Sequence, residues 1–199
     1  MKVLILAGGR GTRLGELTKD TPKPMIEING KPFLEYQINY LKQHKLTDIV
    51  LCVGYLHEQI IDYFGDGSKF GVKIQYSIEE TPLGTGGAIK NAETLLEQDN
   101  EFVVINGDTF LELNYSQFLE NCDFDYFATC VVDRLGISAG IYVLNEHVFG
   151  FIPKDINSSI EDILMTKFII NRYPSTKDFI DIGTLPGLSE FKNLVKGGI

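Results

Sequence analysis

The sequence predicts an α/β protein with a Rossmann-like, mostly parallel but mixed sheet and helices on both faces. Three observations support this fold class. Short aliphatic runs alternate with segments of helical spacing, a glycine-rich turn directly follows the first run, and acidic residues come just after later runs. Open sheets of this kind bind ligands outside the carboxyl ends of their strands, so we expect one crevice at that edge. The 199 residues suit a single domain, residues 1–199.

Each element follows from local residue types. The first strand, 2–7, is aliphatic, and the runs at 48–53, 72–77, 101–105, 126–132 and 137–144 are similarly apolar. Helical spacing or helix-start residues indicate helices at 33–43, 57–64, 84–96 and 115–121. The run from Ser158 to Glu161 has the form of a capping box that opens a further helix. An apolar C-terminal helix, 185–195, could pack on the domain or on a second copy of the chain, as a homo-oligomer.

A glycine-rich turn followed by two fixed cations is the most informative motif. Residues 6–14 read Leu-Ala-Gly-Gly-Arg-Gly-Thr-Arg-Leu, and Lys23 with Pro24 comes shortly after. Glycines let the backbone approach an anion closely, and successive N–H groups in such a turn form an anion-binding concavity. Arg13 can bind phosphate oxygens through two N–H groups, and Lys23 can supply a point charge. The motif predicts a triphosphate site, although a simple turn with solvated cations is the competing interpretation.

Two familiar phosphate loops fit the same glycines poorly. A P-loop ends in Gly-Lys-Ser/Thr, where this chain has Gly11, Thr12 and Arg13. The dinucleotide fingerprint requires a third glycine at the position of Leu14 and an acidic residue after the second strand, where Gly54 stands. Neither loop is therefore predicted.

Composition excludes several classes of partner. The net charge is −9 and no run of Lys or Arg stands out, which argues against nucleic acid or a membrane surface as a partner. Cys52, Cys122 and Cys130 lack metal-ligand spacing, so we expect reduced thiols. The sequence enters a strand without a basic leader or long apolar segment, and we expect a cytoplasmic protein.

Four later motifs occur in a fixed order along the chain. They are Pro82-Leu83-Gly84-Thr85-Gly86-Gly87-Ala88, Asn106-Gly107-Asp108-Thr109, Ala139-Gly140-Ile141-Tyr142 and Asp181-Ile182-Gly183-Thr184. Together with the glycine-rich turn they resemble the signatures of the sugar-1-phosphate nucleotidyltransferases. Within that family the chain is most similar to guanylyltransferases acting on D-glycero-D-manno-heptose 1-phosphate or mannose 1-phosphate. The resemblance implies a fold of the nucleotide-diphospho-sugar transferase type and synthesis of a nucleotide sugar from a nucleoside triphosphate and a sugar 1-phosphate.

The resemblance also implies roles for single residues. Arg13 would stabilise the leaving pyrophosphate and Lys23 the transferred phosphoryl group. Asp108 and Asp181 match the positions that carry the metal in the family, and Mg²⁺ prefers one or two carboxylates plus phosphate oxygens and water. The catalytic residues would thus be Arg13, Lys23 and Asp108. The substrate-binding residues would be Leu6, Ala7, Gly8, Gly9, Gly11, Thr12, Arg13, Glu79, Pro82, Gly84, Thr85, Asn106 and Gly107 for the nucleotide, and Gly140 and Tyr142 for the sugar.

Glu79 bears on the choice of base. It precedes Pro82 at the spacing where related enzymes place the residue that meets the base edge. A carboxylate only accepts hydrogen bonds, and guanine presents two adjacent donors, whereas uracil and thymine flank one N–H with two carbonyls. Glu79 therefore favours GTP, with an exposed glutamate beside Glu80 as the alternative interpretation.

One segment departs from the family pattern. Relatives place a hairpin and a Glu-Lys pair that binds the sugar before the motif containing Gly140, but here only residues 133–137 follow Val132. Either Arg134 or Lys167 takes over this role, or sugar binding is weakened, or the chain is a shortened version of a fuller enzyme. The expected function is GMP transfer from GTP to a sugar 1-phosphate. The alternatives are a uridylyl- or thymidylyltransferase, and a regulatory protein that binds a nucleotide sugar without turnover.

Overall fold

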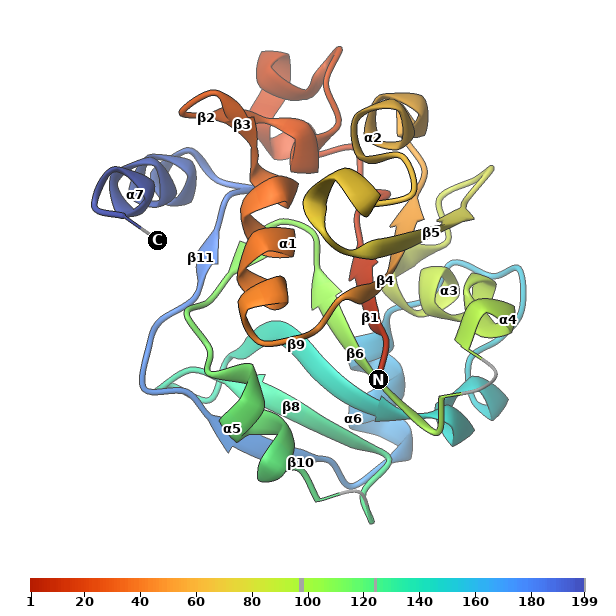
Figure 1. Ribbon diagram of the computed structural model, residues 1–199. Helices are drawn as coiled ribbons and strands as arrows, with labels where there is room; N and C mark the ends of the chain where they lie inside the picture. Colours follow the sequence, from red (N-terminus) through yellow and green to blue (C-terminus); the bar gives the residue numbers. More distant parts are fainter. Residues whose placement is uncertain (97–98, 124, 199) are drawn as a thin grey trace.

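The computed structural model describes residues 1–96, 99–123 and 125–198, and its centre is one seven-stranded sheet (Figure 1). The strand order across the sheet is β10, β8, β9, β6, β1, β4, β5. The strands are β1 (Val3–Leu6), β4 (Asp48–Val53), β5 (Lys73–Ile78), β6 (Glu101–Asn106), β8 (Ala128–Val132), β9 (Ser138–Asn145) and β10 (Asn171–Pro174).

Most neighbouring strands run parallel. β1 pairs in parallel with β4 and β6, β4 with β5, and β8 with β10. Only β9 among these strands is antiparallel to its neighbours, β6 and β8. The predicted mostly parallel, mixed sheet is confirmed, and each predicted strand lies within two residues of its expected bounds.

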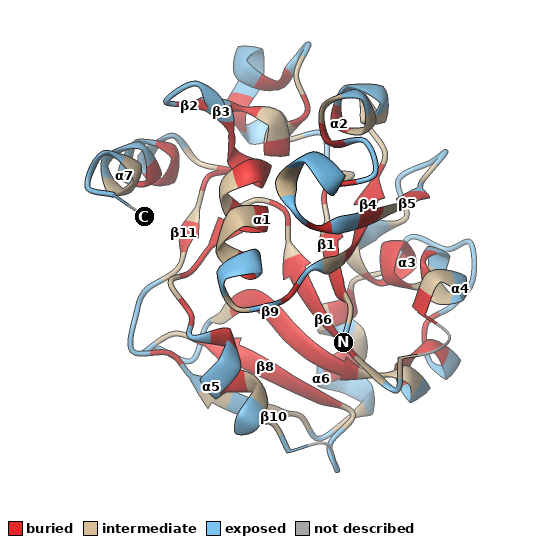
Figure 2. Ribbon diagram, in the orientation of Figure 1, coloured by how far each residue is buried: buried red, intermediate tan, exposed pale blue. Residues whose placement is uncertain are grey.

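Alternating side chains of the strands enter two helical layers. Val3 and Ile5 of β1 pack with α1, α2 and α5, whereas Leu4 packs with α3, α4 and α6 on the opposite face. The helices are α1 (Phe33–Gln43), α2 (His57–Phe64), α3 (Gly84–Asn91), α4 (Glu93–Leu96), α5 (Tyr115–Glu120), α6 (Ile160–Lys167) and α7 (Leu185–Lys196). Figure 2 shows buried central strands and helices that are exposed on their outer sides. A sheet covered on both faces explains why its strands are apolar throughout.

A smaller apolar cluster surrounds α7 beside the sheet. The ring of the fully buried Phe191 lies 4.9 Å from that of Phe33 and 5.0 Å from that of Phe110. The cluster joins α7 to two short antiparallel pairs, β2 (Glu27–Ile28) with β3 (Lys31–Pro32) and β7 (Thr109–Phe110) with β11 (Ile180–Asp181). The C-terminal helix therefore packs on its own chain. Short 3-10 helices occupy Thr12–Thr18, Lys23–Met25, Ser68–Phe70 and Glu146–Gly150.

Several elements differ from the sequence prediction, and three of these differences have a local cause. The predicted helix 84–96 is divided into α3 and α4 at Ala92, whose N–H is shared between two carbonyl oxygens of the preceding turn. Helix α6 is capped by Ser159 and not by Ser158, because the Ser159 hydroxyl accepts the Asp162 N–H at 3.1 Å. Strand β10 was missed because this edge strand carries polar residues and Pro174, with little apolar patterning.

Candidate active site

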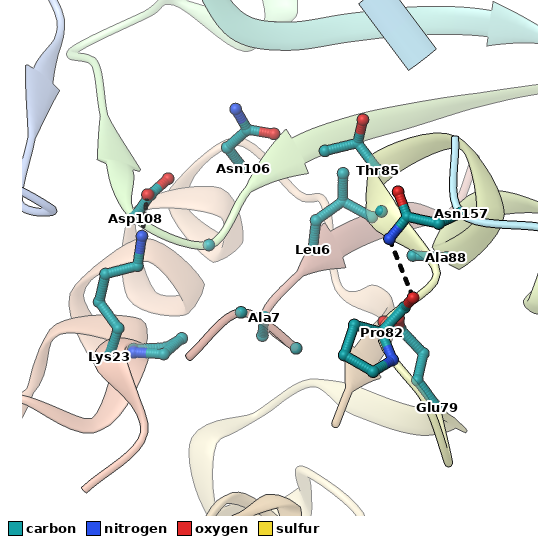
Figure 3. A pocket seen from close by; sticks show the side chains of 15 residues that line it. Leu6, Ala7, Lys23, Glu79, Pro82, Thr85, Ala88, Asn106, Asp108 and Asn157 are labelled. Atoms are coloured by element: carbon teal, nitrogen blue, oxygen red, sulfur yellow. Dashed lines mark hydrogen bonds and ion pairs between the residues drawn. The ribbon is translucent and has the colours of Figure 1, made fainter. Parts of the chain in front are cut away.

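A cavity of about 300 Å³ opens beyond the carboxyl ends of β1, β5 and β6 (Figure 3). This size is at the lower end of the range for small-molecule sites. The lining residues are Leu6, Ala7, Gly8, Gly9, Lys23, Pro24, Glu79, Pro82, Gly84, Thr85, Ala88, Asn106, Gly107, Asp108 and Asn157. All except Pro24, Ala88 and Asn157 were expected to bind substrate or to act in catalysis. Pro24 and Ala88 belong to motifs already recognised, whereas nothing in the sequence singles out Asn157.

The glycine-rich turn allows the strand ends to approach one another. A Cβ atom on Gly8 would lie 2.7 Å from the Glu79 Oε1 atom, and one on Gly107 would lie 2.6 Å from the Leu6 carbonyl oxygen. Gly107 has no room for a side chain, whereas a Cβ on Gly8 would displace the Glu79 carboxylate. At Gly9 an added Cβ would meet nothing within 4 Å, so the turn is open there.

Lys23 and Asp108 form an ion pair at one end of the cavity (Figure 3). Lys23 begins the 3-10 helix Lys23–Met25, and Asp108 lies just after β6. Their side chains are only 13% and 19% exposed. Gly11, with a φ of +65°, supports this end of the cavity, since a Cβ there would lie 3.0 Å from the Lys23 Cβ. Loss of either charge would leave its largely buried partner uncompensated.

Arg13 and Asp181 form a second ion pair beside the first, with Arg13 Nη1 3.3 Å from Asp181 Oδ2. β11 pairs with β7, and this pairing brings Asp181 close to Asp108. Next to Asp181, the Ile182 N–H donates to the Asp108 carbonyl oxygen at 2.9 Å. A Cβ on Gly183 would lie 2.7 Å from Arg13 Nη2 and 3.3 Å from Lys23 Nζ. Both cations and both acids therefore gather at one rim, although Arg13 and Asp181 do not line the cavity itself.

Glu79 lies at the opposite end of the cavity, just beyond β5 (Figure 3). Its Oε2 atom accepts the Leu83 N–H at 3.1 Å. Burial raises the pKa of the Glu79 carboxyl, and the bond from Leu83 opposes this shift. The second oxygen lies beside Gly8, where the glycine-rich turn meets the cavity.

A distant segment holds the nucleotide loop, defined as residues 82–88. The donors and acceptors are Asn157 Nδ2 to the Pro82 carbonyl (3.0 Å), Ser158 N–H to the Leu83 carbonyl (2.9 Å), Gly86 N–H to the Ser158 carbonyl (2.8 Å) and Ile160 N–H to Thr85 Oγ1 (2.9 Å). We call residues 156–161 the bracket segment. It explains why Asn157 enters the cavity wall.

The glycines of the nucleotide loop allow the bracket segment to pack closely against the loop. Gly84 has a φ of +70°, and a Cβ there would lie 2.5 Å from the Ser158 carbonyl oxygen. A Cβ on Gly87 would lie 2.9 Å from the Ile156 carbonyl oxygen. Small residues at a helix start could make room for base and ribose and leave the loop amides free to donate. This does not hold for Gly86, whose N–H is bonded to the bracket segment.

Gly140 and Tyr142 lie behind the cavity and do not line it. Gly140 lies near the start of β9 and reaches the edge of the sheet that carries the cavity because β9 is antiparallel to β6. Its φ is +66°, and an added Cβ would overlap the side-chain amide of Asn106, which does line the cavity. Tyr142 is 2% exposed. Sugar contact by either residue stays a prediction.

The shortened segment after β8 forms a tight turn. Asp133 Oδ1 accepts the N–H groups of Leu135 and Ile137, both at 2.8 Å. Arg134 extends away to Asp178, with 3.0 Å between its Nη2 and the Asp178 Oδ2. Lys167 ends α6 and is exposed. Neither cation lines the cavity, where Lys23 is the only positive side chain among the described residues.

Two other properties bear on ligands. Within residues 1–96, 99–123 and 125–198, no group of three or more His, Cys, Asp or Glu side chains could enclose a metal ion. Asp108 and Asp181 offer two carboxylates at one rim, and oxygen ligands from a substrate would have to complete a metal site there. The described helices are all too short or too polar to cross a membrane.

The sequence is similar to a family of nucleotidyl transferases and to two heptose 1-phosphate guanylyltransferases. A family model described as "Nucleotidyl transferase" matches residues 2–134. The D-glycero-alpha-D-manno-heptose 1-phosphate guanylyltransferase of Campylobacter jejuni is 39% identical, over 92% of this chain and 95% of that protein. The protein of the same name from Aneurinibacillus thermoaerophilus is 33% identical, over 92% and 93% of the two chains.

Solved structures agree with the sequence comparison. HddC from Yersinia pseudotuberculosis, complexed with GMP-PN, has a TM-score of 0.85 and 33% identity over 98% of this chain and 99% of that chain. A putative glucose-1-phosphate thymidylyltransferase from Bacillus anthracis has a TM-score of 0.84 at 24% identity, over 100% and 96% of the two chains, which shows the fold alone. Because the family model matches residues 2–134 and a relative 39% identical aligns with almost the whole chain, the protein belongs to the nucleotidyl transferase family.

Proposed function

We propose that the protein is a guanylyltransferase that transfers GMP from GTP to D-glycero-D-manno-heptose 1-phosphate, giving a GDP-sugar and pyrophosphate. The observation that carries the proposal is the single cavity that joins the glycine-rich turn, the Lys23–Asp108 pair and the Glu79 carboxylate. Relatives named as heptose 1-phosphate guanylyltransferases, and the likeness to HddC complexed with GMP-PN, support it. The choice of heptose rests on those names.

The reaction requires alignment and charge neutralisation. A phosphate oxygen of the sugar 1-phosphate attacks the α-phosphorus of GTP and forms a new P–O bond, while the bond to the bridging oxygen breaks and pyrophosphate leaves with its electron pair. Because the nucleophile is already an anion, no general base is needed. Lys23, which is largely buried, would neutralise the transferred phosphoryl group. Arg13, whose side chain is 61% exposed, would neutralise the leaving pyrophosphate at the outer side of the rim.

Mg²⁺ is the metal that this rim would hold. Asp108 and Asp181 supply two carboxylates from the adjacent strands β7 and β11 or their ends, and each already lies beside a cation. This donor set fits Mg²⁺, which completes its shell with phosphate oxygens and water. When bound, the ion would supply neutralisation of phosphate charge. Lys23 and Arg13 would then exchange their carboxylate partners for phosphate oxygens.

Glu79 is the group that we assign to base selection. It reaches the cavity end opposite the polyphosphate rim, and its carboxylate can accept from the adjacent N1–H and 2-amino donors of guanine. Uracil or thymine would direct carbonyl oxygens at the same carboxylate. The uridylyl or thymidylyl alternative is therefore disfavoured. A regulatory protein without turnover is disfavoured as well, because it would not need Arg13, Lys23, Asp108 and Asp181 at one rim.

The proposed setting follows from the substrates. We place the enzyme in the cytoplasm, where Cys52, Cys122 and Cys130 would remain reduced, as they are in the structure. Its GDP-sugar would serve the synthesis of a surface polysaccharide. The partners are thus two small phosphorylated molecules, without nucleic acid or membrane.

A matrix of nucleotides and sugar phosphates tests the proposal. Pyrophosphate release is measured for GTP, UTP, dTTP, CTP and ATP, each with heptose, mannose and glucose 1-phosphates, with and without Mg²⁺. We expect the highest kcat/KM for GTP with the heptose 1-phosphate and no turnover in EDTA. A preference for a pyrimidine nucleotide would overturn the base assignment, and GTP binding without turnover would favour the regulatory alternative.

A further inference from the structure

Glu161, in the first turn of α6, is a carboxylate outside the cavity wall that bonds to two other elements and to the N-cap of its own helix. Its Oε2 atom accepts from the Thr85 hydroxyl of α3 at 3.1 Å and from the Ser159 hydroxyl at 3.1 Å. Its Oε1 atom accepts from the Tyr142 hydroxyl of β9 at 2.9 Å. Hydrogen bonds to an ionised acceptor are stronger than neutral ones, so this carboxylate fixes the three hydroxyls firmly.

The hydroxyls of Ser138 and Tyr142 donate their hydrogen bonds in the same direction, toward Glu161. Burial, and then the charge of Glu161, raise the pKa of Tyr142, so its hydroxyl keeps its proton and donates it to Glu161. The Ser138 hydroxyl, 2.8 Å from the Tyr142 oxygen, must then donate to Tyr142. Ser138 Oγ in turn accepts the Gly140 N–H at 3.1 Å. We call this chain of bonds, from Gly140 to Glu161 and on to Thr85, the relay.

Both ends of the relay reach the cavity wall. Thr85 lines the cavity in the nucleotide loop, and its Oγ1 also accepts the Ile160 N–H at 2.9 Å. At the other end, the left-handed backbone of Gly140 makes room for the side chain of Asn106, which lines the cavity between the nucleotide loop and Asp108. Glu161 thus connects the nucleotide loop to Asn106. Although the sequence motif placed Asn106 with the nucleotide, this arm runs through Gly140 and Tyr142, the residues expected to serve the sugar, so we assign this half of the cavity to the sugar phosphate.

We propose that Glu161 is a positioning residue that holds both substrate subsites in register through this relay, an inference that rests on the proposed transferase function. One arm, through Thr85, orients the nucleotide loop. The other arm, through Tyr142 and Ser138, fixes the backbone bulge at Gly140 and with it the Asn106 side chain.

Helix capping does not explain these contacts. The N-terminus of α6 is already capped by Ser159, whose hydroxyl accepts the Asp162 N–H at 3.1 Å. Asp162 also supplies an exposed acid in the first turn, whose negative charge stabilises the helix by interacting with the positive end of the helix dipole. The carboxylate of Glu161 faces the relay, where a purely structural role in α6 would not require it.

The test compares variants that cut different arms. Glu161→Ala removes the junction, Tyr142→Phe cuts only the arm to β9, and Glu161→Gln keeps the shape and can still accept and donate. Asp162→Asn is the matched control, because this neighbouring carboxylate is exposed and takes no part in the relay. For each variant, KM values for GTP and sugar 1-phosphate, kcat and the melting temperature are measured, and calorimetry gives the Kd for a non-hydrolysable GTP analogue.

The expected pattern is selective. Glu161→Ala should raise both KM values and the analogue Kd about tenfold, whereas Tyr142→Phe should raise only the KM for the sugar phosphate, by about fivefold. Glu161→Gln should restore both KM values to within about threefold of wild type, because an amide can bond to the same hydroxyls. Asp162→Asn should match wild type in every measurement.

Two results would overturn the relay. One is a Glu161→Ala protein with wild-type KM and Kd values, and the other is a Tyr142→Phe protein in which both KM values are unchanged or rise equally. If Glu161→Ala does not fold, Tyr142→Phe decides by the same criterion. Absence of turnover in the wild-type protein would instead refute the proposed function. The analogue Kd would still test the arm through Thr85 in that case, because it should rise in Glu161→Ala and stay at the wild-type value in Tyr142→Phe.

Discussion

At the residue scale, the polyphosphate rim is built from charges that already have partners. Lys23 pairs with Asp108, and Arg13 pairs with Asp181. A phosphate entering this rim competes with carboxylates for the two cations. The rim therefore depends on both acids and both bases together, which makes single charge changes informative.

Asp108→Asn tests the assignment of this residue to the metal. Loss of one carboxylate should lower kcat by at least about a hundredfold, because the charge of the transferred group would be neutralised less well. The amide can still accept a hydrogen bond from Lys23 but leaves the largely buried Lys23 charge unpaired, which costs about 3–5 kcal/mol. We therefore expect the melting temperature to fall by about 2–4 °C for each kcal/mol lost. Pyrophosphate release and thermal unfolding are the two measurements.

A matched control for Asp108→Asn is Asp178→Asn. Asp178 also pairs with a cation, Arg134, but both side chains are more than half exposed. Exposed ion pairs contribute little to stability, and this one lies outside the cavity. The control should keep wild-type turnover and melting temperature. Retained turnover in Asp108→Asn would remove Asp108 from the metal site.

Glu79→Gln separates stability from base selection. Burial raises the pKa of Glu79 in the folded protein. The stability linked to this group is complete below its unfolded pKa and is lost as the pH rises through the folded pKa. Glu79→Gln should therefore melt at the same or a higher temperature than wild type at pH 8, with a smaller difference at pH 5. A lower melting temperature at pH 8 would contradict the burial argument.

Binding of GTP should depend on the same proton. Protonation turns one Glu79 oxygen into a donor, which faces the donors of guanine unfavourably. We expect the wild-type KM for GTP to rise as the pH falls toward the raised pKa, and the Glu79→Gln KM to be about tenfold higher at pH 8 and to vary less with pH. Initial rates from pH 5 to 8 test this, and parallel pH profiles for both proteins would argue against contact between Glu79 and the base.

At the scale of elements, the nucleotide loop depends on the bracket segment. Gly84→Ala places a Cβ at a φ of +70° and 2.5 Å from the Ser158 carbonyl oxygen. We expect a loss of stability of about 1–3 kcal/mol and a higher KM for GTP, because the loop must move away from the bracket segment. Thermal unfolding and initial rates measure the two effects.

Gly150→Ala, outside the nucleotide loop, is the control for Gly84→Ala. Gly150 has no left-handed φ, and an added Cβ there would meet nothing within 4 Å. Its stability and its KM for GTP should remain at wild-type values. Equal effects of the two substitutions would show that the loss in Gly84→Ala does not come from contact with the bracket segment.

Helix α7 has a comparable role for β11. Gly187, in its first turn, lies so close that an added Cβ would overlap the Asp181 carbonyl oxygen. Phe191 anchors the helix to Phe33 and Phe110. The apolar cluster around α7 thereby fixes the strand that carries the second acid of the rim.

Phe191→Ala should weaken both the fold and the rim. Removing a buried aromatic ring costs about 3–5 kcal/mol. We also expect kcat to fall at temperatures where the variant is still folded, because β11 would no longer be held against β7. Circular dichroism melts and initial rates below the transition test this, with the exposed Lys192→Ala on the same helix as the control. Unchanged kcat in folded Phe191→Ala would mean that α7 stabilises the protein without positioning Asp181.

At the scale of the whole molecule, one edge of the sheet collects residues separated by most of the chain. Arg13 and Asp181 are 168 residues apart and form an ion pair, and Thr85 and Glu161 are 76 apart and share a hydrogen bond. The parallel strands bring their carboxyl ends together, and the antiparallel β9 adds its beginning to the same edge. Figure 1 shows how β11 and α7, from the end of the chain, lie beside α1 and the first loops.

The amino-acid sequence alone determined the α/β class, the positions of most strands and helices, and most of the cavity wall. Those features depend on local patterns: aliphatic runs, glycines at strand ends, and acids just beyond them. Only the tertiary structure decided that the loop glycines serve residues 156–161, that Asn157 enters the wall, that Gly140 and Tyr142 lie behind it, and that Glu161 connects its two halves. These facts depend on contacts between segments far apart in the chain, and no local spacing encodes which of them will meet.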